Sequence, residues 1–468
     1  MLAVLCAVLA LGVTATNGQI GVAKPQLSAT QSGAFAATVA VDASEPVVGT
    51  TNSHYIGLSF ESGTLNSGKF DNVGNLAQML RNLGSSVMRF GGNSVDASYT
   101  KITPSALAGL VRLAKASGWT VLYSEDLAHF NAKAVTKDAH KVNAALGHYL
   151  AEFACGNEPD LFPNNGLRRS PYTESDYLAQ AAPCLAAIRA GAPKSRLEGP
   201  DTSGRGWLPG YAAVEAGHLR WIGQHYYPMG CGLGGRTPAA FAQTMLSAAQ
   251  TAKEVAFFSA AAQAAVAAHA SLRLSETNTA CGGGAPGVSD SYASALWVID
   301  YLLTGVEHGV SGFNFHGGLD TSCQGYTPLC QVWGNEYAAQ PIYYGMLFAH
   351  LLGAGQLTPV TVASPSRGAN VTAFALKPLN GGGLRLMVEN LTGSAAVVTL
   401  RVGSAASSAT VLHLTGPSLL ATSGVSIQGA RVAADGSLRP GRPDTVKCSS
   451  GSCPVTLAPY SAAIVAVS

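Results

Sequence analysis

From Tyr55 onward, short apolar runs recur along the chain, and each is followed by glycine, asparagine or acidic residues and then by a stretch with helical spacing. The runs are Ile56–Glu61, Val87–Gly92, Thr120–Asp126, Glu152–Pro159, Arg196–Thr202, Trp221–Tyr227, Leu272–Asn278 and Gly312–Gly317. Strands that alternate with helical stretches indicate βα units and a parallel sheet. Eight such units predict an α/β fold of the (β/α)8 TIM-barrel type, which typically needs about 250 residues.

A second pattern begins at about Thr358, where short segments alternate apolar and polar residues and turn residues separate them. The segments are Val371–Leu376, Leu384–Glu389, Ala396–Val402, Thr410–Leu414 and Val455–Val467. Short strands of this kind predict a C-terminal antiparallel β-sandwich domain. The earlier segment Ala37–Asp42 also reads as a strand, and we expect it to join the sandwich before the barrel begins.

The chain therefore divides into four predicted parts. Residues 1–18 form a signal peptide, 19–54 an N-terminal segment that gives a strand to the β-domain, 55–354 the barrel and 355–468 the sandwich. The signal rests on the apolar run Leu2–Val13, which small residues such as Ala15 follow and which is too short to span a bilayer. The usual basic start is missing, since the first basic residue is Lys24, and a buried N-terminal helix is the alternative.

Composition excludes some classes of protein. Hydrophobic residues make up 47% of the chain and charged residues 12%, whereas a disordered chain needs low hydrophobicity and high charge. The net charge of +2 gives no electrostatic reason to expect nucleic acid or an anionic membrane as partner.

The cysteine count agrees with export from the cell. Of nine cysteines, Cys6 would leave with the signal, and the remaining eight allow four disulfides. The close pairs Cys323/Cys330 and Cys448/Cys453 could each close a short loop, which would leave Cys155/Cys184 and Cys231/Cys281 as a hypothesis. Two glycosylation sequons begin at Asn370 and Asn390. We therefore expect a secreted, extracellular protein without a membrane anchor in its mature form.

The chemistry of a barrel of this type lies at the C-terminal ends of its strands, and polar residues end all eight runs. These residues are Glu61, Arg89 with Asn93, Glu125 with Asp126, Asn157 with Glu158, Asp201, His225 to Tyr227, Glu276 to Asn278, and His316. Glu158 in Asn-Glu-Pro ends the fourth run, and Glu276 in Glu-Thr-Asn ends the seventh. Retaining glycoside hydrolysis needs two such carboxyl groups, about 5–5.5 Å apart, one as acid and base and the other as nucleophile.

These motifs extend into a longer series. The stretches are Gly57-Leu-Ser-Phe-Glu61, Arg89-Phe-Gly-Gly-Asn93, Gly156-Asn-Glu-Pro-Asp-Leu-Phe162, Gly199-Pro-Asp201, His225-Tyr-Tyr227, Glu276-Thr-Asn278, Gly287-Val-Ser-Asp290, Asn314-Phe-His-Gly-Gly318 and Tyr343-Tyr-Gly-Met346. In this order they resemble glycoside hydrolase family 79, the β-glucuronidases and heparanases. The resemblance covers the whole predicted barrel and implies a hydrolase that needs no cofactor and no metal.

The resemblance implies a role for each matching residue. Glu158 would be the acid/base and Glu276 the nucleophile. Tyr227, or alternatively Tyr226, would donate a hydrogen bond to the nucleophile, and Arg89 would keep it ionised. Asn157 would bond to the sugar 2-hydroxyl, and Glu61 would accept hydrogen bonds from other sugar hydroxyls. Asn93 and His316 would bind sugar at the top of the barrel, His316 as a hydrogen-bonding group and not as a metal ligand. Gly325 and Tyr326 resemble the element that holds a uronate carboxylate. Cys281 stands where a family enzyme has tyrosine, so one wall of the uronate site departs from the family's pattern.

The sequence thus predicts a retaining exo-β-glucuronidase that releases terminal β-linked glucuronic acid, with or without a 4-O-methyl group, from glycans or glycoconjugates. One alternative is a heparanase-like endo-β-glucuronidase, which would need a basic cleft, and Arg168-Arg169 is the one local indication of it. The other alternative is a carbohydrate-binding barrel without catalysis, which the presence of both carboxylates disfavours. Asp201, Glu125 and Asp126 are interpreted as structural residues or as parts of outer subsites.

Overall fold

The computed structural model describes residues 33–468, apart from residues 43, 99–100 and 404–405. The predicted signal peptide and Cys6 lie outside this range. Within the described residues, every helix is too short or too polar to cross a bilayer.

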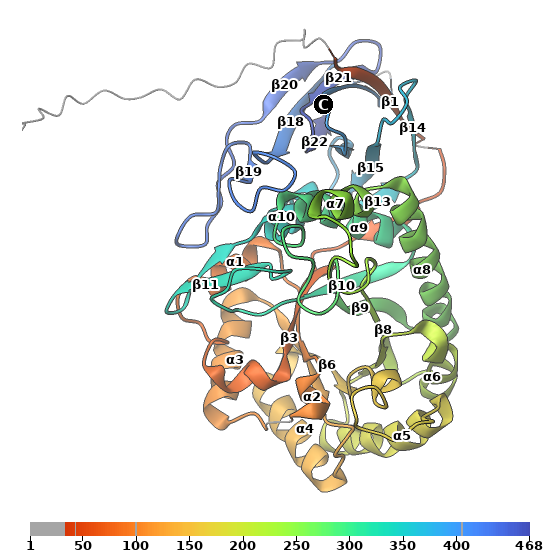
Figure 1. Cartoon of the computed structure of the whole chain (residues 1–468), viewed down its shortest axis with the longest axis vertical. Coiled ribbons are helices and arrows are strands. Elements are labelled where there is room, and N and C mark those ends of the chain that lie inside the picture. Colours follow the sequence, from red (N-terminus) through yellow and green to blue (C-terminus); the bar gives the residue numbers. More distant parts are fainter. Residues whose placement is uncertain (1–32, 43, 99–100, 404–405) are drawn as a thin grey trace, which may run out of the picture. The chain divides into compact units, whose positions relative to one another are not determined.

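The predicted barrel is confirmed as a closed ring of eight parallel strands in the order β10-β3-β4-β5-β6-β7-β8-β9 (Figure 1). Its strands are β3 (Ile56–Glu61), β4 (Val87–Gly91), β5 (Thr120–Glu125), β6 (Leu150–Cys155), β7 (Leu197–Thr202), β8 (Leu219–Tyr226), β9 (Ser271–Thr277) and β10 (Val310–His316). Only β6 departs noticeably from the expected run, because it ends at Cys155 and not at Pro159. Gly156 turns the chain there with a φ of 84°, so Asn157 and Glu158 lie in the loop beyond the strand.

Helices surround the barrel on the outside (Figure 1). They are α1 (Leu76–Asn82), α2 (Ser94–Ala97), α3 (Pro104–Ser117), α4 (Ala132–Leu146), α5 (Glu174–Gly191), α6 (Leu208–Glu215), α7 (Pro238–Met245), α8 (Ala248–Ala267), α9 (Tyr292–Glu307) and α10 (Pro341–Leu352). Side-chain caps start several of them, as where Thr173 and Asp176 form a reciprocal capping box at α5. Helix α9 is buried along almost its whole length, because it lies between the barrel and the β-domain.

The β-domain consists of two sheets packed face to face, as the sequence predicts. One sheet has the order β14-β1-β17-β21, and the other β19-β18-β22-β16-β15-β13-β2, with β20 paired to β18. The strands are β1 (Phe35–Val41), β2 (Gly49–Thr51), β13 (Gly355–Thr358), β14 (Val360–Ala363), β15 (Val371–Pro378), β16 (Arg385–Asn390), β17 (Ala396–Arg401), β18 (Ser408–Thr415), β19 (Ser426–Ile427), β20 (Asp444–Lys447), β21 (Ser452–Leu457) and β22 (Ser461–Val467). Val39, Val398, Val388 and Val465 belong to the apolar core between the two sheets. Contrary to a wholly antiparallel arrangement, β1 pairs with β17 in parallel.

All eight cysteines of the described residues form disulfides, namely Cys155–Cys184, Cys231–Cys281, Cys323–Cys330 and Cys448–Cys453. Cys323–Cys330 joins the loop after β10 to a hairpin that the sequence did not reveal, β11 (Leu329–Trp333) and β12 (Glu336–Ala339).

The sequon asparagine Asn390 has an internal role. Its side chain is fully buried, and Nδ2 donates hydrogen bonds to the carbonyl oxygens of Ser394 and Ala458, both at 2.8 Å. An Nδ2-linked glycan does not fit this packing of Asn390 in the folded protein. At Asn370 the amide donates to the carbonyl oxygen of Leu246 at 2.6 Å.

Candidate active site

Arg89, on β4 inside the barrel, is the hub of the candidate site. It is fully buried, and Nη1 donates to Oγ of Ser59 at 3.0 Å and to Oε2 of Glu276 at 2.8 Å. Nη2 donates to Oδ1 of Asn157 at 2.9 Å and to Oδ2 of Asp201 at 3.0 Å. A guanidinium has only donors, in a fixed fork, so one buried cation fixes side chains from four strands or the loops beyond them.

Glu276 is held as an ionised carboxylate at the end of β9. Tyr227 donates from its hydroxyl to Oε1 at 2.8 Å, and Nδ1 of His316 lies 3.7 Å from Oε2. Burial by itself would raise the pKa of Glu276, but the charges of His316, His225 and Arg89 and the hydrogen bond from Tyr227 outweigh it and lower the pKa. An ionised carboxylate is the form that a nucleophile needs.

Glu158 lies beyond β6 with its backbone in the left-handed region, at a φ of 47°. Its N–H donates to the carbonyl oxygen of Asp201 at 2.8 Å, and its Oε1 lies 3.1 Å from Nδ1 of His225. A carboxylate oxygen of Glu158, one of Glu276 and a ring nitrogen of His225 all lie within 4.8 Å of one another. This separation fits the roughly 5–5.5 Å between the carboxyl groups of a retaining glycosidase better than the 6.5–9.5 Å or so of an inverting one.

The same three side chains could in principle hold a divalent cation, because two carboxylates and an imidazole are common metal donors. Glu276, however, already accepts hydrogen bonds from Arg89 and Tyr227, and the guanidinium places a positive charge beside it. We therefore assign no metal to this group.

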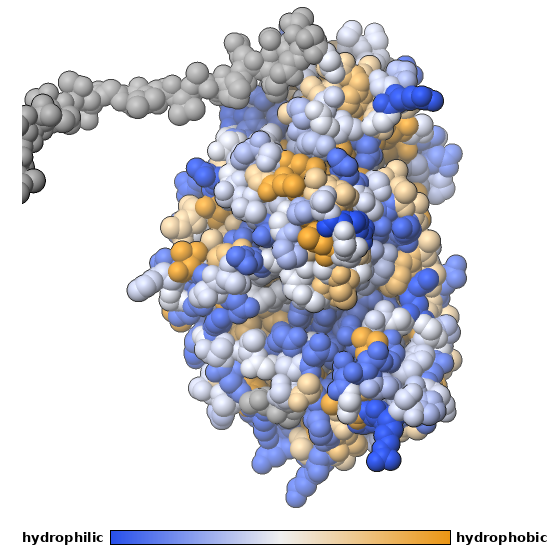
Figure 2. Space-filling model, viewed as in Figure 1, coloured by the Kyte–Doolittle hydropathy of each residue, from blue (hydrophilic) through white to orange (hydrophobic). Residues whose placement is uncertain are grey.

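A pocket of about 730 Å³ opens beside Glu276, between the loops that follow β3, β9 and β10. It is lined by Glu61, Thr64, Gly282, Gly283, Gly284, Pro286, Gly287, Asp290, His316, Gly317, Gly318, Asp320, Ser322, Gln324, Gly325, Tyr326 and Thr327. Its size lies within the roughly 300–1,000 Å³ of small-ligand sites. The space-filling view shows mostly hydrophilic residues over the middle of the barrel (Figure 2).

Glu61 and His316 form one polar wall of this pocket. Oε2 of Glu61 accepts the N–H and the hydroxyl of Ser94, and Oε1 lies 3.7 Å from Nε2 of His316. Burial opposes ionisation of Glu61, but the contacts with His316 and Ser94 outweigh it and lower the pKa of the carboxyl. Both residues thus bring charged or hydrogen-bonding groups to the lining of the pocket.

Tyr326 lines the same pocket next to His316. Its ring lies 6.2 Å from that of Tyr227 and 6.0 Å from that of His316. Its backbone N–H donates to the carbonyl oxygen of Gly283 at 3.2 Å and is therefore not free for a ligand. A side chain at Gly325 would collide with the same carbonyl, which explains the need for glycine there. None of the described residues that line this pocket is a lysine or an arginine.

One residue that the sequence placed in the site, Tyr226, lies away from it. The ring of Tyr226 stacks on Phe257 at 3.6 Å, so Tyr227 and not Tyr226 bonds to Glu276. Asn93 is exposed at the start of α2, where its carbonyl oxygen accepts the N–H of Ala97 at 2.9 Å.

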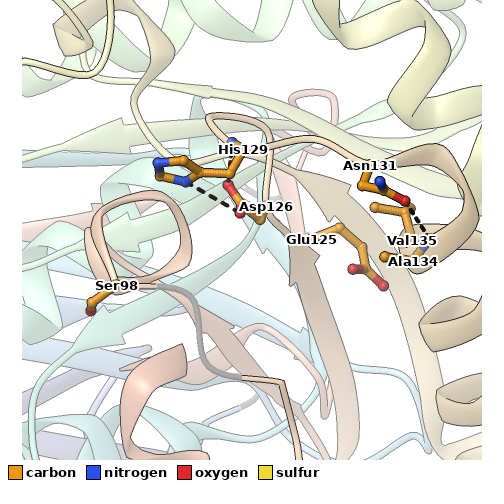
Figure 3. Close-up of a pocket in the computed structure, with 7 residues that line it drawn as sticks. All are labelled: Ser98, Glu125, Asp126, His129, Asn131, Ala134 and Val135. Atoms are coloured by element: carbon orange, nitrogen blue, oxygen red, sulfur yellow. Dashed lines mark hydrogen bonds and ion pairs between the residues drawn. The ribbon is translucent and has the colours of Figure 1, made fainter.

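A second cavity of about 540 Å³ lies beside the loop that follows β5 (Figure 3). It is lined by Ser98, Glu125, Asp126, His129, Asn131, Ala134 and Val135. Glu125 is fully buried, and its carboxyl group points toward Ala134 and Val135 of α4 and away from Asp126 and His129. Burial, together with the charges of Asp138 and Asp126, raises its pKa well above the usual value. Glu125 therefore belongs to the layer between strand and helix and does not reach the carboxyl pair.

Sequence reasoning undervalued Asp201 and His225. His225 bridges Glu158 and Asp201, and Asp201 contacts Arg89. The sequence feature that could have identified them is their place at the end of a barrel strand. Glu125 and Asp126 share this feature, so it does not single out Asp201 and His225.

The barrel thus carries Glu158 in the loop after its fourth strand and Glu276 at the end of its seventh. Solved structures show the same fold. The chain is similar to a 4-O-α-L-rhamnosyl-β-D-glucuronidase from Fusarium oxysporum solved with Rha-GlcA, with 22% identity, a TM-score of 0.76, and coverage of 92% of this chain and 100% of that one. It is also similar to an arabinofuranosidase of family 51 from Xanthomonas axonopodis pv. citri, with 12% identity, a TM-score of 0.65 and coverage of 93% and 100%. A family 44 xyloglucanase from Paenibacillus polymyxa matches with 12% identity, a TM-score of 0.64 and the same coverage.

Neither a protein-family model nor a curated protein matches the chain. At these identities the structural likeness establishes the fold, which is that of glycoside hydrolases.

Proposed function

We propose that this protein is a retaining exo-β-glucuronidase of family 79 type that removes terminal β-linked glucuronic acid from glycans or glycoconjugates outside the cell. The observation that carries the proposal is the close approach of Glu158 and Glu276, with Glu276 ionised between Arg89 and Tyr227. Four disulfides among the described residues agree with an extracellular site of action.

The proposed reaction has two displacements. The carboxylate of Glu276 attacks the anomeric carbon while Glu158 gives its proton to the glycosidic oxygen, so that the bond to the leaving group breaks and a glycosyl ester forms. Glu158, now a carboxylate, then takes a proton from water, the hydroxide oxygen attacks the anomeric carbon, and Glu276 is released. Two inversions retain the β-configuration.

The glucuronide specificity rests on the sequence motifs and on the structural likeness to the Fusarium enzyme. Because the pocket beside Glu276 has no lysine or arginine among its described lining residues, we propose that hydroxyl groups such as that of Tyr326 and backbone N–H groups hold the uronate carboxylate. Cys281, in place of tyrosine, is bonded to Cys231 beside the glycine-rich wall Gly282–Gly284.

One observation counts against the heparanase-like alternative. Its one local indication was Arg168-Arg169, and Arg168 has a structural role. Its Nε donates to Gln180 at 2.9 Å, and Nη1 and Nη2 donate to the carbonyl oxygens of Ala128 and Leu127 at 3.0 and 3.3 Å. An arginine that clamps a loop in this way is poorly placed to bind sulfated or uronate groups.

The proposal is tested by hydrolysis of 4-nitrophenyl β-D-glucuronide against the matching β-D-glucoside, β-D-galactoside and α-L-arabinofuranoside. We expect preference for the glucuronide, and loss of that activity in Glu276→Gln. Glu254→Gln, a buried glutamate on α8 remote from the pocket, is the matched control and should remain active. Cleavage of another glycoside but not of the glucuronide would contradict the specificity, and an inactive wild type on all four would contradict the proposed function as a whole.

A further inference from the structure

Asp201 connects the two halves of the candidate site. Its carbonyl oxygen accepts the N–H of Glu158 at 2.8 Å. Its carboxylate accepts hydrogen bonds from Nη2 of Arg89 at 3.0 Å and from the hydroxyl of Ser275, the residue before Glu276. Like Glu158, Asp201 has a left-handed backbone, with a φ of 56°. For a residue other than glycine this conformation costs on the order of 1–3 kcal/mol, and such strain concentrates at functional sites.

The contacts of His225 fix where its protons lie. Nε2 lies 3.0 Å from Nη2 of Arg89, which has no lone pair to offer, so in the neutral ring Nε2 is the acceptor and Nδ1 carries the proton. In the charged ring both nitrogens carry protons, and Nε2 then faces Oδ1 of Asp201 at 3.6 Å. In either state Nδ1 donates to Oε1 of Glu158 at 3.1 Å. When Glu158 carries a proton, Oε2 is therefore the oxygen that bears it.

We propose that Asp201 is a positioning residue of the proposed reaction: through Arg89 and His225 it orients the carboxyl group of Glu158, so that Oε2 faces the leaving oxygen. This inference rests on the proposed function. It assigns Asp201 no contact with substrate, and its effect passes through side chains that touch the carboxyl pair.

The charged groups around Asp201 and His225 come from several elements. They are Arg89 on β4, Glu158 and Asp160 after β6, Glu198 on β7 and Glu276 on β9. Glu198 is fully buried, and burial and the charge of Asp201 raise its pKa well above the usual value, so it faces Asp201 as a neutral acid. Its carboxyl occupies the space that a side chain at Gly223 would fill. Of the two neighbouring carboxyl groups of Asp201 and Glu198, that of Asp201 is thus the charged one.

The sign of the expected pH effect follows from this charge. Asp201→Asn keeps the shape but removes a buried negative charge, which makes ionisation of neighbouring carboxyl groups easier. Both limbs of the kcat/KM profile should therefore move to lower pH. The comparison is repeated in a Glu198→Gln background, so that Glu198 cannot ionise in place of Asp201.

A leaving-group comparison supplies the decisive measurement. Phenyl β-D-glucuronide needs more help from the general acid than 4-nitrophenyl β-D-glucuronide, because phenol is the poorer leaving group. General acid catalysis is worth about 10²–10⁴-fold, so we expect Asp201→Asn to lower kcat/KM for the phenyl substrate at least about tenfold more than for the nitrophenyl substrate. Asp300→Asn, a buried aspartate on α9, is the matched control and should change neither the ratio nor the pH limbs.

Equal losses on both substrates with unmoved pH limbs would overturn the proposal and leave Asp201 with a merely structural role. If Asp201→Asn does not fold, His225→Asn takes its place, since the shorter amide can still donate to Glu158 but cannot reach Asp201. It should show the same leaving-group dependence, and an unchanged ratio would again overturn the inference. Should the wild type cleave a different glycoside, the phenyl and nitrophenyl forms of that glycoside are used. A wrong glycoside specificity can thereby be distinguished from a wrong role for Asp201.

Discussion

Nη1 of Arg89 donates to Oε2 of Glu276 at 2.8 Å, and both side chains are almost wholly removed from solvent. The ion pair joins the second strand of the barrel to the seventh and keeps one carboxyl group ionised in an interior that would otherwise favour its protonation. Breaking a buried pair on one side leaves an uncompensated charge, which typically costs about 3–5 kcal/mol.

Arg89→Met should therefore destabilise the protein by about 3–5 kcal/mol, since Asp201 and Glu276 both lose their cation. Arg89→Lys keeps the charge but not the fork, and should recover part of the stability while activity stays at least about a hundredfold low, because positioning is lost. Urea unfolding and kcat/KM of the same samples check this. Full activity in the lysine variant would show that charge alone suffices.

Tyr227→Phe removes a hydrogen bond that lowers the pKa of Glu276. The pKa of Glu276 should rise, and the acid limb of the pH profile should move to higher pH, with kcat lowered about tenfold, because a hydrogen bond to a charged group is worth roughly 1.5–3 kcal/mol. The adjacent Tyr226→Phe is the control, since that ring packs on Phe257 outside the site. A shift of the acid limb in both variants or in neither would contradict the assignment.

Stability should fall as the pH rises from about 4, the ordinary pKa of a carboxyl group, to about 8. Burial raises the pKa of Asp300 to about 6, of Glu152 and Glu307 to about 7, and of Glu254 to about 8. A carboxyl whose folded-state pKa is raised stabilises the fold while it is protonated, and that contribution is lost as the pH passes its folded-state pKa. Thermal unfolding measured between pH 4 and pH 9 should give a higher Tm at the acid end of this range. In Glu254→Gln the fall of Tm with rising pH should be smaller. A Tm that rises from pH 6 to pH 8 would count against it.

The Cys231–Cys281 disulfide closes a loop with a sequence separation of 50 and adjoins the wall Gly282–Gly284. Replacing both cysteines by serine should cost about 4 kcal/mol of stability by the chain-entropy relation. It should also raise KM for glucuronides more than it lowers kcat, because the wall, and not the carboxyl pair, loosens. The Cys448–Cys453 pair of the β-domain, replaced in the same way, serves as control and should leave KM unchanged.

The barrel was predictable because each strand lies in an apolar run that ends in a polar residue. The same rule could not decide which strand-end residues face the interior. Glu125 and Asp201 look alike in sequence, yet the first points to α4 and the second to Arg89. The reason is that side chains along β5 alternate between the two faces of the strand. Leu122 packs with Val87 and Trp221 in a small interior cluster, whereas Tyr123 donates a hydrogen bond outward to Asp138. A strand-end residue therefore faces the site or packs against a helix depending on a difference of one position along the strand.

Two further features depended on long-range packing that no local pattern encodes. Asn390 carries a sequon, but its amide is consumed by carbonyl groups of two turns within the β-domain. β1 and β17 pair in parallel, with residues 35–40 beside residues 396–401. Neither segment's own sequence indicates this partner or its direction.

In the proposed reaction Glu276 becomes covalently bound to the sugar, and a trapping experiment can detect this intermediate. The protein is incubated with 2-deoxy-2-fluoro-β-D-glucuronyl fluoride, whose fluorine at carbon 2 slows release of the glycosyl enzyme, and the labelled peptide is then identified by mass spectrometry. We expect time-dependent inactivation and one fluoroglucuronyl group on Glu276, with none in Glu276→Gln. Glucuronide hydrolysis by a wild type that is never labelled, or that carries the label on another residue, would contradict it.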